Sequence, residues 1–479
     1  MLAGSVINSL QAGRQRGAKS KGIAADLARA IVSGELVAGE KLPPQRLLAR
    51  QLGVTLGTVS RAYAELERRS LAYARVGDGT YVRHMDALAS ENAGSVDGAI
   101  DLANNVAVVT AEVDALRRSL GAIAVDEGLM GRILGYQPEA GAMHHRAAGA
   151  HWLRRLGTSG DPARVMVTHG AQHAIAAVLR AIARPGDTVL TEALSYPGLI
   201  ALAQSMRLQL IGVAIDNEGL EPAALDRAAR TFRSRLLFCS PTLHNPTGAT
   251  QSLARRHEIA EIARRRSLLV IEDAVHAVLC EQPPAALSTL LPDRSFLIAS
   301  LSKAMAPGLR VGYLEAAQPW LDKVAASIRT DLWMMAPLMA EIATRWIDDG
   351  DCERLMALQR EAIQRRQVLA RRLLAGQTMR MAPDFPHLWL ELPVPWRAGT
   401  FMAALRQAGV LVRGPEHFAA GRIAMPPAVR ISLNKPATLE LLRNGLVRIR
   451  QCLRDRSAAE TTPRTAARPP GSGPAPPAG

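Results

Sequence analysis

The chain has 479 residues, of which 48% are hydrophobic, and this length favours two or three domains with a sizeable core. No apolar run of about 18 residues occurs and the N-terminal region lacks the apolar stretch of a signal peptide, so we expect a cytoplasmic protein without a membrane span. The four cysteines lack metal-ligand spacing, which predicts reduced thiols and no metal site.

The charge of the chain is unevenly distributed. The formal net charge is +15, and residues 1–84 contain 13 Lys and Arg against six Asp and Glu, a net charge of +7. Nearly half of the excess positive charge therefore lies in under a fifth of the chain. Such a basic segment favours a polyanionic partner.

Residues 20–83 carry apolar residues at helical spacing in three stretches. Pro44 suits the start of the second helix, Gly53 a tight turn, and Thr55 the cap of the third helix. Two short helices around a glycine turn predict a helix-turn-helix, and 71–82 predicts a β-hairpin wing. The residues expected to face inward are Ile23, Leu27, Ile31, Val32, Leu47, Leu48, Leu52, Val59, Ala62, Tyr63 and Leu66.

Polar and basic residues on the outer side of this segment are candidates for contacts with DNA in the major groove. They are Arg46, Arg50, Thr55, Thr58, Ser60 and Arg61. On helical pattern alone, a small helical domain with a solvated basic face fits equally well. The strings Gly-x-Leu-x-x-Gly-x-x-Leu-Pro before Pro44, Leu-Gly-Val-Thr at 52–55 and Gly-x-Gly-Thr-x-Val at 77–82 resemble the GntR-type winged helix. Leu56 stands where that family often has arginine, which leaves the operator sequence open.

The rest of the chain predicts a linker at 84–100, a large domain at 101–455 and a disordered tail at 456–479. Expected strands alternate with helices, which predicts an α/β fold with a mostly parallel sheet and a smaller C-terminal α+β part. The expected strands are 165–168, 188–191, 236–239, 268–271 and 295–299.

The stretch after the last of these strands contains a candidate nucleophile. Lys303 follows two serines, Ser300 and Ser302, and Arg310 comes after a Pro-Gly turn. A sheltered lysine amine forms Schiff bases with carbonyl compounds, and hydroxyls with a guanidinium suit a phosphate monoester. Together they favour pyridoxal 5'-phosphate (PLP), although a surface loop explains the lysine alone.

The string 300–312 resembles the Schiff-base segment of the fold-type I, aminotransferase-like PLP proteins. This resemblance implies a phosphate site formed by Gly170, Ala171, Gln172, Ser300, Ser302 and Arg310, which Tyr136 reaches across a dimer interface. It also implies that Tyr196 stacks on the pyridine ring, Asn245 bonds the ring hydroxyl and Asp273 pairs with the pyridine nitrogen. Arg430 is implied to bind a substrate carboxylate. Singly, each residue also fits a helix cap, a turn or a salt bridge. The chain departs from this family at two places: His276 stands near the position where relatives have tyrosine, and His144-His145 precede Arg146 where many relatives have leucine. Both departures predict slow transamination.

A winged helix, a linker and an aminotransferase-like domain in this order resemble the MocR subfamily of GntR regulators. The resemblance implies a homodimeric transcription factor that binds a double-stranded DNA operator and senses an amine, amino acid or vitamin B6 compound by forming an external aldimine with PLP. Two alternatives are a working aminotransferase with a vestigial DNA-binding domain and a regulator that has lost PLP. The intact Lys303 segment disfavours the second.

Overall fold

The computed structural model describes residues 20–33, 35–36, 40–69, 71–75, 79–82, 98–108, 111–421 and 424–455. Most of the expected linker, the hairpin turn at 76–78 and the tail at 456–479 lie outside these segments. Within them, no helix combines the length and the apolar character that crossing a membrane requires.

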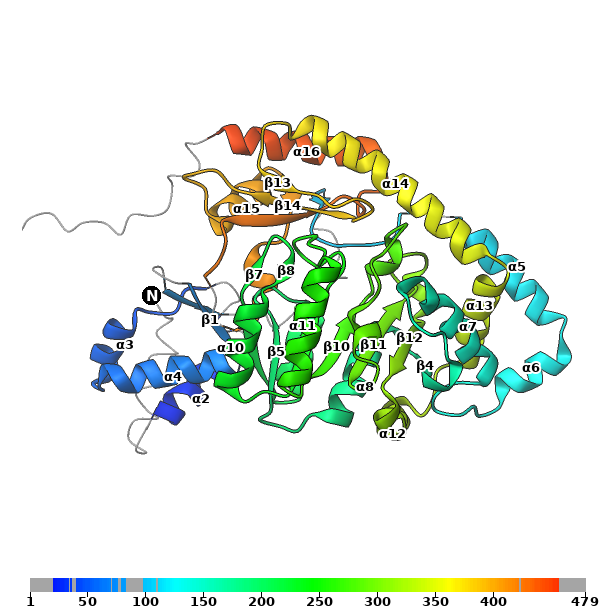
Figure 1. Ribbon diagram of the computed structural model, residues 1–479. Helices are drawn as coiled ribbons and strands as arrows, with labels where there is room; N and C mark the ends of the chain where they lie inside the picture. The colour runs from blue at the N-terminus through cyan, green and yellow to red at the C-terminus, as the bar shows by residue number, and fades with distance from the viewer. Residues whose placement is uncertain are drawn as a thin grey trace, which may run out of the picture.

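Residues 20–82 fold around a core of their own, seen at the blue end of the chain in Figure 1. The elements are α2 (Ser20–Val32), α3 (Gln45–Leu52), α4 (Leu56–Arg68) and the antiparallel strands β1 (Ala72–Arg75) and β2 (Gly79–Val82). Gly53 ends α3 at φ 58°, a left-handed conformation that glycine adopts without strain. Thr55 caps α4, since its side chain accepts a hydrogen bond from the Thr58 N–H. This arrangement confirms the predicted winged helix.

One expected core residue of this domain is exposed. Leu47 was predicted to face inward, but 45% of its surface is accessible. Leu48, Ala49 and Leu52 form the buried side of α3, and Leu47 lies one helical step to the side of that stripe. An eight-residue helix buries only a narrow stripe, and Leu47 lies outside it.

The large domain is built on a seven-stranded sheet in the order β4-β12-β11-β10-β9-β5-β6. The strands are β4 (Val165–Thr168), β5 (Thr188–Glu192), β6 (Gln209–Val213), β9 (Leu236–Cys239), β10 (Leu269–Asp273), β11 (Ser295–Ser300) and β12 (Gly312–Ala316). All neighbours are parallel except β12, which pairs antiparallel with β11 and β4. The sheet is thus mostly parallel, as predicted, with one reversed strand that the apolar pattern did not reveal.

Helices cover both faces of this sheet because successive strand residues point to opposite sides. Phe238 packs in the cluster with α8 and α12, whereas the preceding Leu237 packs in the cluster with α10 and α11. The helices of the large domain are α5 (Glu112–Ala124), α6 (Glu127–Leu134), α7 (Met143–Leu153), α8 (Gly170–Ile182), α9 (Pro197–Ser205), α10 (Pro222–Phe232), α11 (Leu253–Arg265), α12 (Leu321–Leu332) and α13 (Pro337–Asp348).

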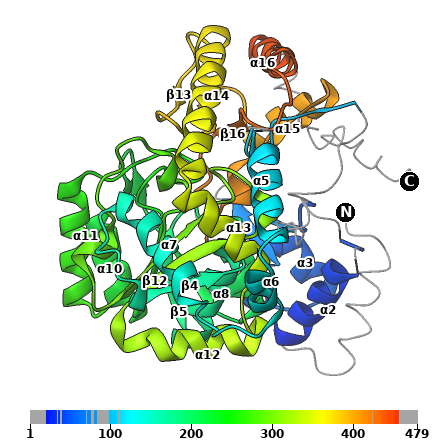
Figure 2. The ribbon, with the colours of Figure 1, turned by 90° about the vertical axis from the view of Figure 1, so that its right-hand side faces the viewer.

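A smaller α+β part completes the chain and lies above the large sheet in Figure 1. The long helix α14 (Asp351–Leu373) leads into it, as Figure 2 also shows. It contains the antiparallel sheet β13-β14-β16 and the parallel pair β15-β3. Its elements are β3 (Ile100–Asp101), β13 (Met379–Arg380), β14 (His387–Glu391), α15 (Ala398–Gln407), β15 (Val410–Leu411), β16 (Ala428–Ser432) and α16 (Leu439–Arg454). Through β3, the segment that follows the linker is built into this smaller part.

The packing of α7 on the large sheet gives a stability prediction. A side chain at Gly149 would overlap the ring of the fully buried Tyr313 in β12. We expect Gly149→Ala to lower the free energy of unfolding by about 1–3 kcal/mol, because overpacking forces the ring or the helix to move. The control Gly131→Ala in α6 meets open space, and we expect a gain of up to about 1 kcal/mol. Denaturant unfolding of both variants tests this, and equal stabilities would contradict the packing argument.

Candidate functional site

The candidate residues of the large domain come together at one edge of the sheet. Asp273 ends β10, Lys303 follows β11, and Gly170 opens α8 directly after β4. Asn245 and Tyr196 lie in the segments that follow β9 and β5. Because parallel strands end at the same edge, side chains far apart in sequence meet where open α/β sheets bind ligands.

Lys303 and Asp273 form the centre of this site. The Lys303 Nζ donates a hydrogen bond to the Asn105 carbonyl oxygen at 3.2 Å. The Asp273 Oδ1 accepts from the Val275 N–H at 3.0 Å. Burial raises the pKa of the Asp273 carboxyl to about 6, while the Val275 N–H and the positive charge of Lys303 act against the rise. The site thus places an amine near a carboxylate that lacks the hydration it would have at the surface.

Arg430, on the central part of β16, links the smaller part of the chain to the large sheet. Its Nη1 donates to the Asn245 Oδ1 at 2.9 Å, and its Nη2 donates to the Ala103 carbonyl oxygen at 2.6 Å. The guanidinium lies 4.9 Å from the centre of the Phe418 ring. Sequence reasoning placed Arg430 and Asn245 in separate roles, whereas the structure brings them into direct contact.

The turn at Gly170 is shaped for a small anion. Gly170 has φ 76°, and a side-chain carbon there would lie 2.7 Å from the Arg310 Nη2. Arg310 Nη2 also donates to the His169 carbonyl oxygen at 3.4 Å, so the guanidinium lies over the N-terminus of α8. Ala171 continues this first turn. A helix N-terminus with an adjacent arginine is a favourable site for a phosphate group.

Four further predicted residues surround this turn. The Gln172 Nε2 donates to the Gly198 carbonyl oxygen at 3.0 Å, and Gln172 and Tyr196 both approach the Gly198 Cα so closely that a side chain there would collide with them. The Ser300 and Ser302 hydroxyls are 2.9 Å apart, and Ser300 also donates to the Val311 carbonyl oxygen. Ser300 is buried, whereas Ser302 is partly accessible.

His276 lies beside Asn105, among aromatic and imidazole rings. Its Nε2 is 3.4 Å from the Asn105 Nδ2, and its ring packs against Phe385 and His387. Burial lowers the pKa of His276 to about 3, and the charges of Lys303 and Arg430 act in the same direction. His276 is therefore neutral at physiological pH and offers one donor and one acceptor nitrogen.

The structure adds residues that sequence reasoning missed. Segment 98–108 supplies Ala103 and Asn105, whose carbonyls accept from Arg430 and Lys303, and its Asn104 Oδ1 accepts from the Arg413 guanidinium. His387 is fully buried beside His276, and within the part of the chain that the structure describes neither of its ring nitrogens has a hydrogen-bond partner. No local motif marks these positions, because each contact joins segments more than 100 residues apart.

Tyr136 lies apart from these contacts. Tyr136 is 85% exposed and its ring lies 6.0 Å from that of Trp333, so its contact across a dimer interface stays a prediction.

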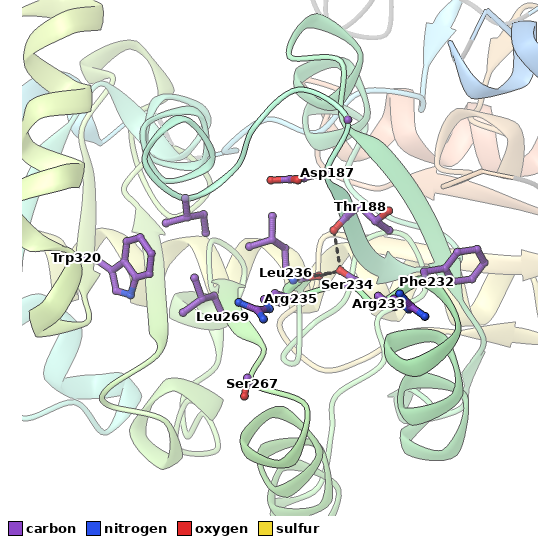
Figure 3. A pocket seen from close by; sticks show the side chains of 12 residues that line it. Asp187, Thr188, Phe232, Arg233, Ser234, Arg235, Leu236, Ser267, Leu269 and Trp320 are labelled. Carbon is purple, nitrogen blue, oxygen red and sulfur yellow. Dashed lines mark hydrogen bonds between the residues drawn. The ribbon is translucent and has the colours of Figure 1, made fainter.

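A hollow of about 560 Å³ opens at the amino-terminal ends of β5, β9 and β10, the opposite edge of the sheet from Asp273 (Figure 3). Arg233 and Arg235 line it, and the Ser234 hydroxyl bonds the Thr188 carbonyl oxygen, without a lysine or a buried carboxylate.

The candidate DNA-contacting residues gather around the turn between α3 and α4. Their side chains are exposed, except that of Thr58, which is partly buried: Arg46, Arg50, Thr55, Thr58, Ser60 and Arg61. The Thr55 and Thr58 hydroxyls are 2.9 Å apart, and the Ser60 hydroxyl donates to the Gln45 Oε1 at 2.7 Å. Ser60 therefore also ties α4 to α3, a role that sequence reasoning did not give it.

Known proteins resemble both parts of the chain. The family model "Aminotransferase class I and II" matches residues 98–446, and the model "Bacterial regulatory proteins, gntR family" matches residues 19–82. The HTH-type transcriptional regulator YdeF of Bacillus subtilis is 31% identical, over 91% of this chain and 94% of its own length. The vitamin B6 salvage pathway transcriptional repressor PtsJ of Salmonella typhimurium is 26% identical, over 84% of this chain and 91% of its own.

Solved structures share the fold of the large domain. The kynurenine aminotransferase of Pyrococcus horikoshii superposes with a TM-score of 0.69 at 21% identity, covering 78% of this chain and 94% of its own. At this identity the likeness concerns the fold. Together, the two family models and the relatives show that the chain belongs to the aminotransferase class I and II family, within the MocR-type regulators that carry a GntR helix-turn-helix ahead of that domain.

Proposed function

We propose that the protein is a transcriptional regulator in which residues 20–83 bind an operator and residues 101–455, joined to them by a linker, sense an amine with the help of PLP. Two relatives carry names of this kind, since YdeF is named an HTH-type transcriptional regulator and PtsJ a repressor of vitamin B6 salvage. A cytoplasmic homodimer, in which Tyr136 reaches the partner's site, belongs to the same proposal.

The residues of the candidate site fit PLP by their chemistry. When bound, PLP supplies an aldehyde that condenses reversibly with primary amines. Lys303 is the amine of this chain at the site, and the Gly170 turn with Arg310 suits a phosphate. Asp273 offers a carboxylate to a pyridine N–H, and such a cation would offset the burial that raises the pKa of this carboxyl to about 6.

The observation that carries the sensing proposal is the hydrogen bonding of segment 98–108. Lys303 and Arg430 donate to its Asn105 and Ala103 carbonyls, and this segment is the one that follows the linker from the winged helix. An amino-acid effector presents an amine and a carboxylate. Its carboxylate suits the paired donors of Arg430, and its amine would take the place that the Lys303 amine has at the site.

Effector binding therefore draws on the same two side chains that hold segment 98–108. When Arg430 turns its donors to a carboxylate, the Ala103 carbonyl and the Asn245 amide lose their present partner. A ligand that binds more tightly to one conformation of this segment increases the population of that conformation. Because the segment follows the linker to the winged helix, this change would alter the spacing of the two winged helices on DNA.

An aminotransferase is the second candidate, because Lys303, Asp273, Asn245 and Arg430 are all in place. His276 argues against fast turnover, since a neutral, buried imidazole stands where relatives use a tyrosine hydroxyl. Assays with amino donors and keto acids separate the two functions. Turnover at about 1–1000 per second would favour the enzyme.

Asp273→Asn is expected to have opposite effects on stability and on cofactor binding. The cofactor-free variant should be more stable than wild type at pH 8, since it removes a charge that is partly desolvated and keeps an acceptor for the Val275 N–H. The raised pKa means that folded Asp273 takes up its proton near pH 6, so the gain should shrink as the pH falls from 6 to 4. PLP binding should weaken at least about tenfold, the equivalent of one pKa unit of lost interaction.

Thermal unfolding across this pH range and PLP titration by absorbance measure the two effects. Asp322→Asn, at an exposed position in α12, is the control and should change neither. A gain of the Asp273 variant that persists unchanged at pH 4 would contradict the assigned cause.

Lys303→Ala should abolish covalent attachment of PLP. After borohydride reduction of the wild-type protein, peptide mass spectrometry should find the cofactor on Lys303, and amine effectors should no longer affect operator binding by the variant. Lys323→Ala, in α12 next to Trp320, is the matched control and should behave as wild type. Attachment to another lysine in the wild-type protein would refute the assignment.

Operator binding should depend steeply on salt, because each neutralised phosphate contributes about −0.9 to the slope of log K against log salt. Arg61→Ala should reduce the steepness by about one such unit if Arg61 contacts a phosphate, and should relax one base position if it contacts guanine. Mobility-shift titrations on the protein's own upstream DNA at several salt concentrations measure both effects, with Arg117→Ala in α5 as control. If the wild-type protein prefers neither this DNA nor any other site in its genome over random DNA at physiological salt, the regulator proposal is refuted.

A further inference from the structure

Three side chains of metal-ligand type meet between α7 and α13, away from the site described above. His144 and His145 stand in the first turn of α7, and Glu341 stands in α13. The Nε2 atoms of both histidines are 3.2 Å from the same carboxylate oxygen, Glu341 Oε2. All the potential ligand atoms lie within 4.8 Å of one another.

The separations suit coordination by one ion. Zinc binds imidazole nitrogen and carboxylate oxygen at about 2.0–2.2 Å, so two such ligands on a tetrahedron are about 3.3–3.6 Å apart. The observed 3.2 Å lies just below that range and at the long end of N–H···O distances, which are about 2.7–3.2 Å. The two imidazole rings lie side by side, with centres 3.9 Å apart, so that both can direct Nε2 to one point.

The surroundings hold the carboxylate in place and leave one side open. The second oxygen of Glu341, Oε1, accepts from the Arg345 Nε at 2.9 Å, one helical turn further along α13. Glu341 and His145 are buried, whereas His144 is exposed. Arg345 thus pairs with one oxygen of Glu341 and leaves the other oxygen to the two histidines.

We propose that His144, His145 and Glu341 bind one divalent transition-metal ion, with Zn²⁺ the best match. Two imidazoles and one carboxylate are a known zinc donor set, and the exposed side leaves a fourth position for water. Arg345, which donates to the other oxygen of Glu341, would hold the carboxylate in the orientation that the ion needs. The ion would join α7 to α13, and this proposal replaces the sequence-based prediction of no metal site.

Zinc titration of the untagged, full-length protein after dialysis against a chelator tests the proposal. We expect one Zn²⁺ per chain by calorimetry, and visible ligand-field absorption of the tetrahedral type when Co²⁺ replaces it. His144→Ala, His145→Ala and Glu341→Gln should each weaken Zn²⁺ binding by more than about 100-fold, because loss of an outer-shell partner alone costs about 10–100-fold. Arg345→Gln should fall within that smaller range.

His257→Ala, at an exposed position in α11, is the matched control and should leave Zn²⁺ binding unchanged. His144 is exposed, so its alanine variant keeps the core intact even if the buried His145 variant unfolds. Wild-type affinity equal to that of His144→Ala, or Co²⁺ absorption that survives in Glu341→Gln, would overturn the proposal.

Discussion

The bonds from Lys303 and Arg430 to backbone carbonyls are the interactions on which the candidate site depends. Segment 98–108 has little regular structure beyond β3, so its inner carbonyls need side-chain partners. Leaving a buried hydrogen-bonding group unpaired costs about 1–3 kcal/mol, the same range as typical coupling free energies between sites. A ligand that takes either cation therefore disturbs this segment by an amount large enough for regulation.

The same site is maintained at a cost in stability. The sheet ends β10 at the half-buried Asp273, where desolvation disfavours its charge, and places His387 where, among the described residues, neither ring nitrogen has a hydrogen-bond partner. Groups of this kind persist when the surrounding packing fixes them, and here β10 lies in the middle of seven strands. A ligand that donated a hydrogen bond to Asp273 would offset this cost, so a feature that destabilises the free protein would favour binding.

The sequence predicted those features of the fold that depend on residues close together in the chain. The apolar runs located β4 and β9 to the residue, and the Gly53 turn and the Thr55 cap defined the start of α4. Long-range pairing was invisible, because a strand has the same composition whether it runs parallel, like β10, or antiparallel, like β12. The bond between Lys303 and Asn105 joins residues 198 positions apart, and nothing in either local sequence indicates the other.

The two proposed ligand sites share one connection in the fold. The loop between α12 and α13 contains Met334, whose carbonyl oxygen lies 3.3 Å from the His169 Nε2 and whose sulfur accepts from the Gln137 N–H. His169 precedes the Gly170 turn, and Gln137 follows Tyr136. An ion that fixes the start of α13 against α7 would therefore also limit the movement of a loop that touches both predicted phosphate-binding elements. The two proposed sites are thus joined by a chain of contacting residues. The coupling free energy between the sites equals the difference between the zinc-binding free energies of the cofactor-free and the cofactor-bound protein.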